Sequence, residues 1–237
     1  MISPTAAHPK PKGKHHGVRL QEGIQEFYLP PKKPGIVTVP PMSYLAVRGH
    51  GDPNAEGGEY RLAIELLYGV AYTIKMSKRS DHRIDGYFDF VVPPLEGLWW
   101  QEGAHGVDYA RKEDFDWVSL IRLPDFVTAD EVAWAKAEAA AKKGRDFDKV
   151  GFFAYDEGLC VQCLHVGPYD DEPTTVEAMH AYMEAQGYAL DIADERHHHE
   201  IYLSDARRVA PERLRTVVRH PIKITQEDGG TVPSSHA

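Results

Sequence analysis

The sequence contains few cysteines, and their spacing excludes the usual uses of a cysteine pair. Only Cys160 and Cys163 occur among the 237 residues, within the segment GLCVQCLHV. The β-branched residues and flanking glycines of this segment predict a strand, in which residues i and i+3 point to opposite faces. A disulfide or a two-thiolate metal site is therefore not expected, and both thiols are predicted to be packing groups.

Long apolar runs and targeting signals are also missing. No stretch approaches the ~18 apolar residues of a membrane-spanning helix, and the N-terminal segment MISPTAAHPKPKGKHHGVRL has no apolar signal-peptide core. We therefore expect a cytoplasmic protein without a membrane partner.

Motifs for phosphate binding and for nucleophilic hydrolysis do not occur. The sequence has no G-x-x-x-x-G-K-S/T, no G-x-G-x-x-G and no G-x-S-x-G. The run His197 to His199 lacks the spacing of a chelating site, because neighbouring strand residues diverge and no third ligand occurs at a suitable spacing. The sequence therefore predicts neither a metal nor a cofactor.

Negative charge dominates everywhere except at the N-terminus. The net charge is −9, yet the first 41 residues carry six Lys/Arg against two Asp/Glu, together with eight of the 17 prolines. Residues 1–40 are predicted to form a proline-rich basic arm that extends over the body. The acidic body argues against direct nucleic-acid binding, although the arm itself could touch nucleic acid or lipid.

Alternating strand and helix patterns in the first half predict an α+β fold. A strand over MSYLAVRGHG precedes a helix from about Glu59 to Met76, whose apolar residues recur at i, i+3 and i+4. Two period-two segments follow, GYFDFVV and DWVSLIRL, and both predict strands. Thr128 and Glu131 then form a capping box ahead of an alanine-rich helix that ends at Gly144.

The second half repeats the order of the first. KVGFFAYDEGLCVQCLHV predicts a hairpin, and it is followed by a helix with Pro173 in its first turn, the strand HHHEIYLSD and a last strand near Arg213–Arg219. We therefore predict two βαββ units, over about 41–124 and 125–222, related by a pseudo-twofold with a central ligand cleft, and a polar tail over 223–237. The sequence leaves open whether the protein is a monomer or a dimer.

The strand HHHEIYLSD places polar groups on one face. With period two, His198, Glu200 and Tyr202 share a face, while His199 and Ile201 share the apolar face that suits packing on helices. A carboxylate beside a phenol opposite an apolar face is typical of a ligand site. A solvated outer face explains the same pattern equally well.

Aromatic residues supply further candidates for a ligand wall. Tyr68 and Tyr72 are adjacent at i and i+4 on the first helix, where core packing is the alternative. Trp99 and Trp100 follow a Gly/Pro turn, where full burial of both rings is awkward, so a ligand wall is at least as favoured there. Tyr169, in the turn GPYDDEP, is predicted to lie near the rim of the cleft.

Four blocks of the sequence resemble the GyrI-like small-molecule-binding family. The resemblance runs from about Met42 to Arg219, and the blocks occur in the family's order. They are YGVAYTIK (68–75), LEGLWW (95–100), EGLCVQCLHVGPYDDEP (157–173) and HHEIYLSDARRVAPERLRTVVR (198–219).

This resemblance implies a duplicated SHS2-type fold, which also forms the effector-binding domain of multidrug-responsive transcription regulators. Such domains hold hydrophobic, often cationic, ligands in an aromatic pocket with an acidic residue. Glu200 matches the acidic position, with His198 beside it. The positions that match the cavity-lining blocks are Tyr68, Tyr72, Trp99, Trp100 and Tyr202. No helix-turn-helix segment precedes the domain, so a stand-alone member is expected.

Some stand-alone members of the family hydrolyse cyclopropane-bearing, DNA-alkylating compounds. By this resemblance, Glu200 is expected to activate water while Tyr68 or Tyr72 donates a hydrogen bond to the carbonyl oxygen of the substrate. Two alternatives stay open: passive binding of a cationic drug, and a gyrase-inhibitor-like interaction through the protein surface.

Overall fold

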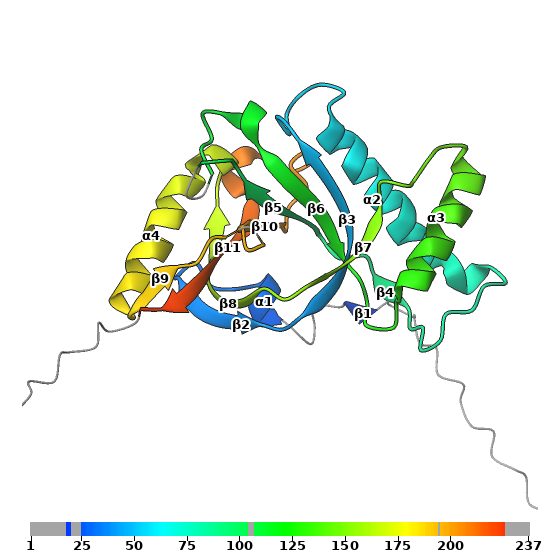
Figure 1. Ribbon diagram of the computed structural model, residues 1–237, viewed down its shortest axis with the longest axis horizontal. Helices are drawn as coiled ribbons and strands as arrows, with labels where there is room; N and C mark the ends of the chain where they lie inside the picture. Colours follow the sequence, from blue (N-terminus) through cyan, green and yellow to red (C-terminus); the bar gives the residue numbers. More distant parts are fainter. Residues whose placement is uncertain (1–17, 20–24, 104–106, 194, 226–237) are drawn as a thin grey trace, which may run out of the picture.

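The computed structural model describes residues 18–19, 25–103, 107–193 and 195–225, and Figure 1 shows their arrangement. Two units have the order strand, helix, strand, strand. The first contains β3 (Met42–His50), α2 (Glu59–Met76), β5 (Leu95–Trp100) and β6 (Asp116–Arg122). The second contains β8 (Gly158–Val166), α4 (Glu172–Ala185), β10 (His198–Tyr202) and β11 (Arg215–Ile224).

Further elements surround these two units. They are β1 (Val18–Arg19), α1 (Gln25–Tyr28), β2 (Gly35–Val39), β4 (Phe90–Val91), α3 (Ala129–Lys143), β7 (Gly151–Tyr155) and β9 (Tyr188–Leu190), with single 3-10 turns at Ser77–Arg79, Lys112–Asp114, Tyr169–Asp171 and Pro211–Arg213. Among the described residues, none of the helices combines the length and the apolar character that crossing a bilayer requires.

One antiparallel sheet joins the two units. Its strands lie in the order β2-β8-β11-β10-β5-β6-β3-β7, so β8-β11-β10 mirrors β3-β6-β5 about the central pair β10 and β5. In that pair, Glu200 lies opposite Gly97 and His198 lies opposite Trp99. The junction of the two units therefore runs directly beside Glu200.

The helices of the two units, α2 and α4, cover the same face of this sheet. Cross-strand partners point to the same face, and Val218, Glu200, Gly97 and Ser119 are successive partners across β11, β10, β5 and β6. Val218 packs in the cluster of α4, while Trp117 and Ile121 of β6, which share a face with Ser119, pack against α2. The side chain of Glu200 therefore lies on the face that α4 and α2 cover; Figure 1 shows these two helices and β10.

Several predictions about single elements are confirmed. The first long helix has the predicted bounds, and Thr128 caps α3 by accepting a hydrogen bond from the Glu131 amide, with Gly144 left-handed at the other end. Cys160 and Cys163 are buried free thiols, as predicted.

Two predictions about strands are wrong. GYFDFVV contributes only the two-residue β4, and the strand that the first unit places at the centre of the sheet is LEGLWW, whose residues are buried on both faces and therefore do not alternate. The predicted hairpin does not form, because β7 pairs with β3 whereas β8 pairs with β2 and β11. The chain thus crosses from one unit to the other at 156–157.

The predicted N-terminal arm differs from the structure over its second part. Residues 35–39 form β2 and pair with β8, and Phe27 and Tyr28 are buried on the sheet face opposite α2 and α4. The face of β10 that carries Ile201 packs there, against this segment and the sheet itself, and not on the long helices as expected. Residues 1–17, 20–24 and 226–237 of the predicted arm and tail lie outside the described residues.

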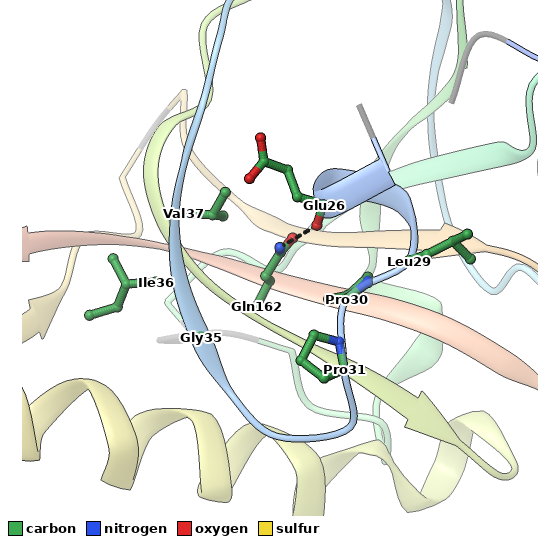
Figure 2. Close-up of a pocket in the computed structure, with 8 residues that line it drawn as sticks. All are labelled: Glu26, Leu29, Pro30, Pro31, Gly35, Ile36, Val37 and Gln162. Carbon is green, nitrogen blue, oxygen red and sulfur yellow. Dashed lines mark hydrogen bonds between the residues drawn. The ribbon is translucent and has the colours of Figure 1, made fainter. Parts of the chain in front are cut away.

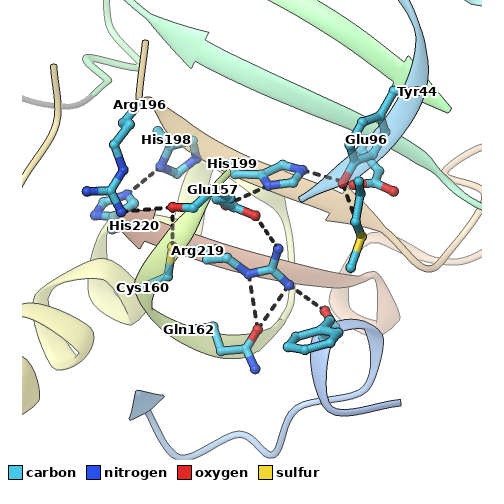
Figure 3. A network of polar contacts seen from close by, with 12 residues as sticks. Tyr44, Glu96, Glu157, Cys160, Gln162, Arg196, His198, His199, Arg219 and His220 are labelled. Atoms are coloured by element: carbon cyan, nitrogen blue, oxygen red, sulfur yellow. Dashed lines mark hydrogen bonds and ion pairs between the residues drawn. The ribbon is translucent and has the colours of Figure 1, made fainter. Parts of the chain in front are cut away.

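A buried network of charges fastens this N-terminal segment to the sheet (Figure 3). Arg219 donates to Glu157 Oε2 at 2.6 Å and to the Phe27 carbonyl at 2.6 Å. His199 bridges Glu157 and Glu96 at 2.9 and 3.0 Å. These side chains are almost completely buried, so the network has no water to replace a lost partner.

Opposite charges decide the protonation states in this network. Burial alone would raise the pKa of Glu157, but the Arg219 guanidinium and His199 lower it to about 2. Burial would likewise lower the pKa of His199, but Glu157 and Glu96 raise it to about 9. Both groups are therefore charged at neutral pH, and the Glu157 contribution to stability is lost only as the pH falls toward about 2.

Candidate functional site

Two buried carboxylates meet on the helix-covered face. Glu200 comes from the central strand β10, and Glu172 is the first residue of α4. Their exposed fractions are 6% and 0%. His198 lies between them, with Nε2 at 2.9 Å from Glu200 Oε1 and at 3.9 Å from Glu172 Oε2.

The two carboxylates differ in protonation. Burial and the charge of Glu200 raise the pKa of Glu172 well above its usual value, and Glu172 hydrogen-bonds to Glu200. Glu172 is therefore protonated at neutral pH, and His198 contacts its partner Glu200. The N-terminus of α4, with its partial positive charge, further favours a negative charge at this place.

Phenols and an indole surround the pair. Tyr109 donates to Glu172 Oε2 at 2.9 Å, and Trp99 donates its indole N–H to the Tyr202 oxygen at 3.0 Å. The Tyr169 ring meets the Tyr202 ring edge-on, and the Tyr60 ring lies 5.2 Å from that of Trp99. The Glu200 carboxylate is therefore held among aromatic rings.

These phenols stay protonated at neutral pH. Burial, followed by the charge of Glu200, raises the pKa of Tyr169 to about 12 and holds that of Tyr202 well above its usual value. Each hydroxyl is thus available as a hydrogen-bond donor beside a carboxylate that can accept a proton. This combination suits a reaction in which a base removes a proton while a donor stabilises developing negative charge.

The structure brings some of the predicted site residues together and places others elsewhere. Glu200, His198, Tyr202, Trp99 and Tyr169 come together as described. Their neighbours Glu172, Tyr60 and Tyr109 were missed, because each comes from a distant segment and GPYDDEP reads as a turn. Glu172 lies within GPYDDEP itself, directly before the Pro173 that marks the first turn of the helix, and this position is its only signal in the sequence.

The other predicted residues lie apart from this cluster. Tyr68 and Tyr72 are further along α2, with ring centroids 6.2 Å apart, and 51% of Tyr72 is exposed. None of the contacts described for either residue reaches Glu200. Trp100 points to the opposite face of the sheet, where its ring stacks on His197 at 4.1 Å.

The carboxylates and His198 also have donor atoms that one cation could bridge. The ligand atoms of Glu172, His198 and Glu200 lie within 4.8 Å of one another. A proton on Glu172 is a second explanation of the same arrangement, in which His198 contacts Glu200 Oε1 and Tyr109 donates to Glu172 Oε2. We therefore interpret the cluster as a proton-sharing pair.

A cavity of about 210 Å³ lies elsewhere (Figure 2). It opens between the N-terminal segment and β2, where Gln162 donates to the Glu26 carbonyl at 2.7 Å. Its lining consists of Glu26, Leu29, Pro30, Pro31, Gly35, Ile36, Val37 and Gln162. None of these residues belongs to the cluster around Glu200.

Comparisons with known proteins point to one family. A family model described as the GyrI-like small molecule binding domain matches residues 32–223. No curated protein matches. Three crystal structures from Listeria innocua are similar: one described as an uncharacterized conserved protein (46% identity, 87% of this chain, all of that chain, TM-score 0.82) and two described as hydrolases. The two hydrolases are 44% and 43% identical to this chain and have TM-scores of 0.81 and 0.79. The matches cover 88% and 87% of this chain and all of each hydrolase chain.

Proposed function

The chain belongs to the GyrI-like small-molecule-binding domain family, and from this premise we propose that it hydrolyses a planar, hydrophobic small molecule at Glu200. The observation that carries the proposal is the buried carboxylate of Glu200, held beside protonated phenols on the face between α2 and α4. Two relatives that match this chain over their whole length are described as hydrolases, which supports an enzymatic function.

The substrate class follows from the chemistry of the site. A carboxylate base whose described contacts include no serine or cysteine suits an electrophile that water itself attacks, such as a cyclopropane conjugated to a dienone. Water adds to the strained methylene carbon, the ring C–C bond breaks, and its electron pair moves to the carbonyl oxygen. Glu200 takes the proton of the attacking water, and a phenol hydroxyl stabilises the new oxyanion.

Aromatic residues would hold the planar substrate. Trp99, Tyr202 and Tyr169 lie next to Glu200 and are assigned to the reactive end of the substrate. Tyr169 is assigned as the donor to the carbonyl oxygen of the substrate. Tyr68 and Tyr72 lie further out on α2 and are assigned to the distal part of the ligand, where Tyr68 could also donate. His198 orients Glu200. Trp100 faces the other side of the sheet and is left out of the proposed ligand wall.

A second candidate is a non-catalytic drug-binding protein. The single negative charge of Glu200 among aromatic rings also suits a cationic ligand, which would gain both charge pairing and cation–π contacts. The two functions differ in stoichiometry, because a binder holds one ligand whereas an enzyme releases product and acts again.

Turnover of a spirocyclopropyl dienone in large molar excess over the protein tests the proposal. We expect many equivalents to be consumed, with product heavier by one water, as followed by mass spectrometry. Because no metal takes part in the proposed step, a chelator should leave the rate unchanged. Capture that stops at one equivalent would favour the binder, and a rate abolished by the chelator and restored by a divalent cation would overturn the proton-sharing interpretation.

A further inference from the structure

Three histidines form an unbroken line from Glu200 toward the surface of α4. His198 Nε2 lies 2.9 Å from Glu200 Oε1, and its Nδ1 lies 2.7 Å from His220 Nε2. His220 Nδ1 in turn lies 2.8 Å from His180 Nε2. The line crosses three elements, β10, β11 and α4, and Figure 3 shows its His198–His220 step.

The side chains become more exposed along this line from His198 to His180. His198 and His220 are buried, with exposed fractions of 0% and 1%, whereas His180 is partly exposed on α4. Glu200 is therefore connected to solvent on the α4 side by imidazoles alone, away from the phenols of Tyr169 and Tyr202. None of the steps proposed above uses His220 or His180.

We infer that His198, His220 and His180 form a proton relay between Glu200 and solvent. The inference rests on the proposed function, because a base that takes a proton from water must lose it before the next turnover. A planar ligand stacked on the aromatic rings would cover the direct route from Glu200 to solvent. The relay leaves on the other side, so it stays open while the ligand is bound.

The geometry matches what proton transfer through imidazole requires. A neutral imidazole donates from one nitrogen and accepts at the other, and in each ring of the line one nitrogen faces inward and one outward. Glu200 passes its proton to His198 Nε2, His198 Nδ1 passes one to His220 Nε2, and His220 Nδ1 passes one to His180 Nε2. His180 then releases the proton on its Nδ1 to water, so each ring gains one proton and loses one.

The electrostatic surroundings of His220 and His180 favour the neutral form that relays protons. Burial, followed by the neighbouring His198 and His180, lowers the pKa of His220 well below its usual value. Burial also lowers the pKa of His180, although Glu184 on the same helix acts in the opposite direction. Glu172 faces His198 from the start of α4 and is itself protonated.

A purely structural role for the three rings makes a different prediction. Buried polar side chains need partners, so the line could exist only to satisfy His220. In that case, removing His180 would loosen the packing and would speed exchange of the His220 ring N–H with solvent. A relay predicts the opposite, because removing its outer member closes the path.

The test uses His180→Phe, which keeps a ring in place but cannot carry a proton. NMR of protein labelled with nitrogen-15 at histidine measures how fast the His220 ring N–H exchanges with solvent. We expect His180→Phe to slow this exchange by about tenfold or more. The matched control is His82→Phe, another partly exposed histidine, which stacks on Trp134 and lies outside the line. An exchange rate that is unchanged or faster in His180→Phe would overturn the relay.

A kinetic arm separates the relay from the proposed function. With the spirocyclopropyl dienone, kcat of His180→Phe should fall by about tenfold at unchanged KM, within the range of proton-transfer effects. His180→Ala should regain kcat when imidazole is added, which a structural loss would not. A wild-type protein without turnover would reject the hydrolase function, while the NMR result still decides the relay. If His180→Phe kept the kcat of the wild type, the relay would be rejected and the hydrolase function would stand.

Discussion

Glu200→Gln is expected to lower kcat by about 10²–10⁴-fold, with ligand affinity changed far less. Glutamine has the shape of glutamate and keeps an oxygen that can face His198 Nε2, which lies 2.9 Å from Glu200 Oε1. It cannot accept the proton of the attacking water. The substitution therefore removes the base and leaves the aromatic surroundings in place. Steady-state kinetics and equilibrium binding of the same compound measure the two effects separately.

The control for this substitution is Glu177→Gln, an exposed carboxylate on α4. It changes the net charge by the same amount but lies outside the cluster, so its kcat should match that of the wild type. Thermal melting of both variants checks that they are folded. A Glu200→Gln variant that keeps wild-type kcat would remove Glu200 from the reaction.

The largest effect on stability is expected for Arg219→Met, which should lower the free energy of unfolding by about 3–5 kcal/mol. The guanidinium is 1% exposed and bonds Glu157, Gln162 and the Phe27 carbonyl. Methionine fills much of the space but leaves the Glu157 charge buried without its main partner. Urea denaturation of the wild type and the variant measures the difference.

Arg207→Met is the matched control for this substitution. Arg207 also pairs with a carboxylate, that of Asp205, but its side chain is 87% exposed. Water replaces the lost partner there, so stability should hardly change. If Arg219→Met and Arg207→Met were equally stable, the buried network would not be what holds the N-terminal segment to the sheet.

Local patterns in the sequence predict the helices and the face of β10 well, because they depend on neighbouring residues. The side-chain period of two places His198, Glu200 and Tyr202 together, as the structure shows. Thr128 and Gly144 mark the ends of α3 through their own hydrogen bonds and backbone angles. Such features need no knowledge of distant contacts.

What could not be predicted depends on pairing between distant segments. LEGLWW has no alternation because both faces of a central strand are buried, so its strand character was missed, and with it the opposite directions of Trp99 and Trp100. Two successive strands look like a hairpin whether or not they pair, and only the sheet order shows that β7 and β8 belong to different units. The buried state of Glu172 arises where α4 meets β10, which no local pattern shows.

Glu172 also changes the chemistry expected of the site. Burial and the charge of Glu200 raise the pKa of Glu172, so the site holds a protonated carboxyl group next to the proposed base. Glu200 lies on the central strand, at the junction of the two units, and the protonated Glu172 lies at the start of α4. The second unit thus brings together two groups that are 28 positions apart in the sequence.

The most direct test asks which oxygen atom enters the product. A single turnover of the spirocyclopropyl dienone, with protein in excess and in water labelled with oxygen-18, should give product that carries the label at once, because Glu200 acts as a base on water. Unlabelled product in the first turnover, with the label appearing in the Glu200 carboxylate afterwards, would show that Glu200 attacks the substrate itself and would contradict the account.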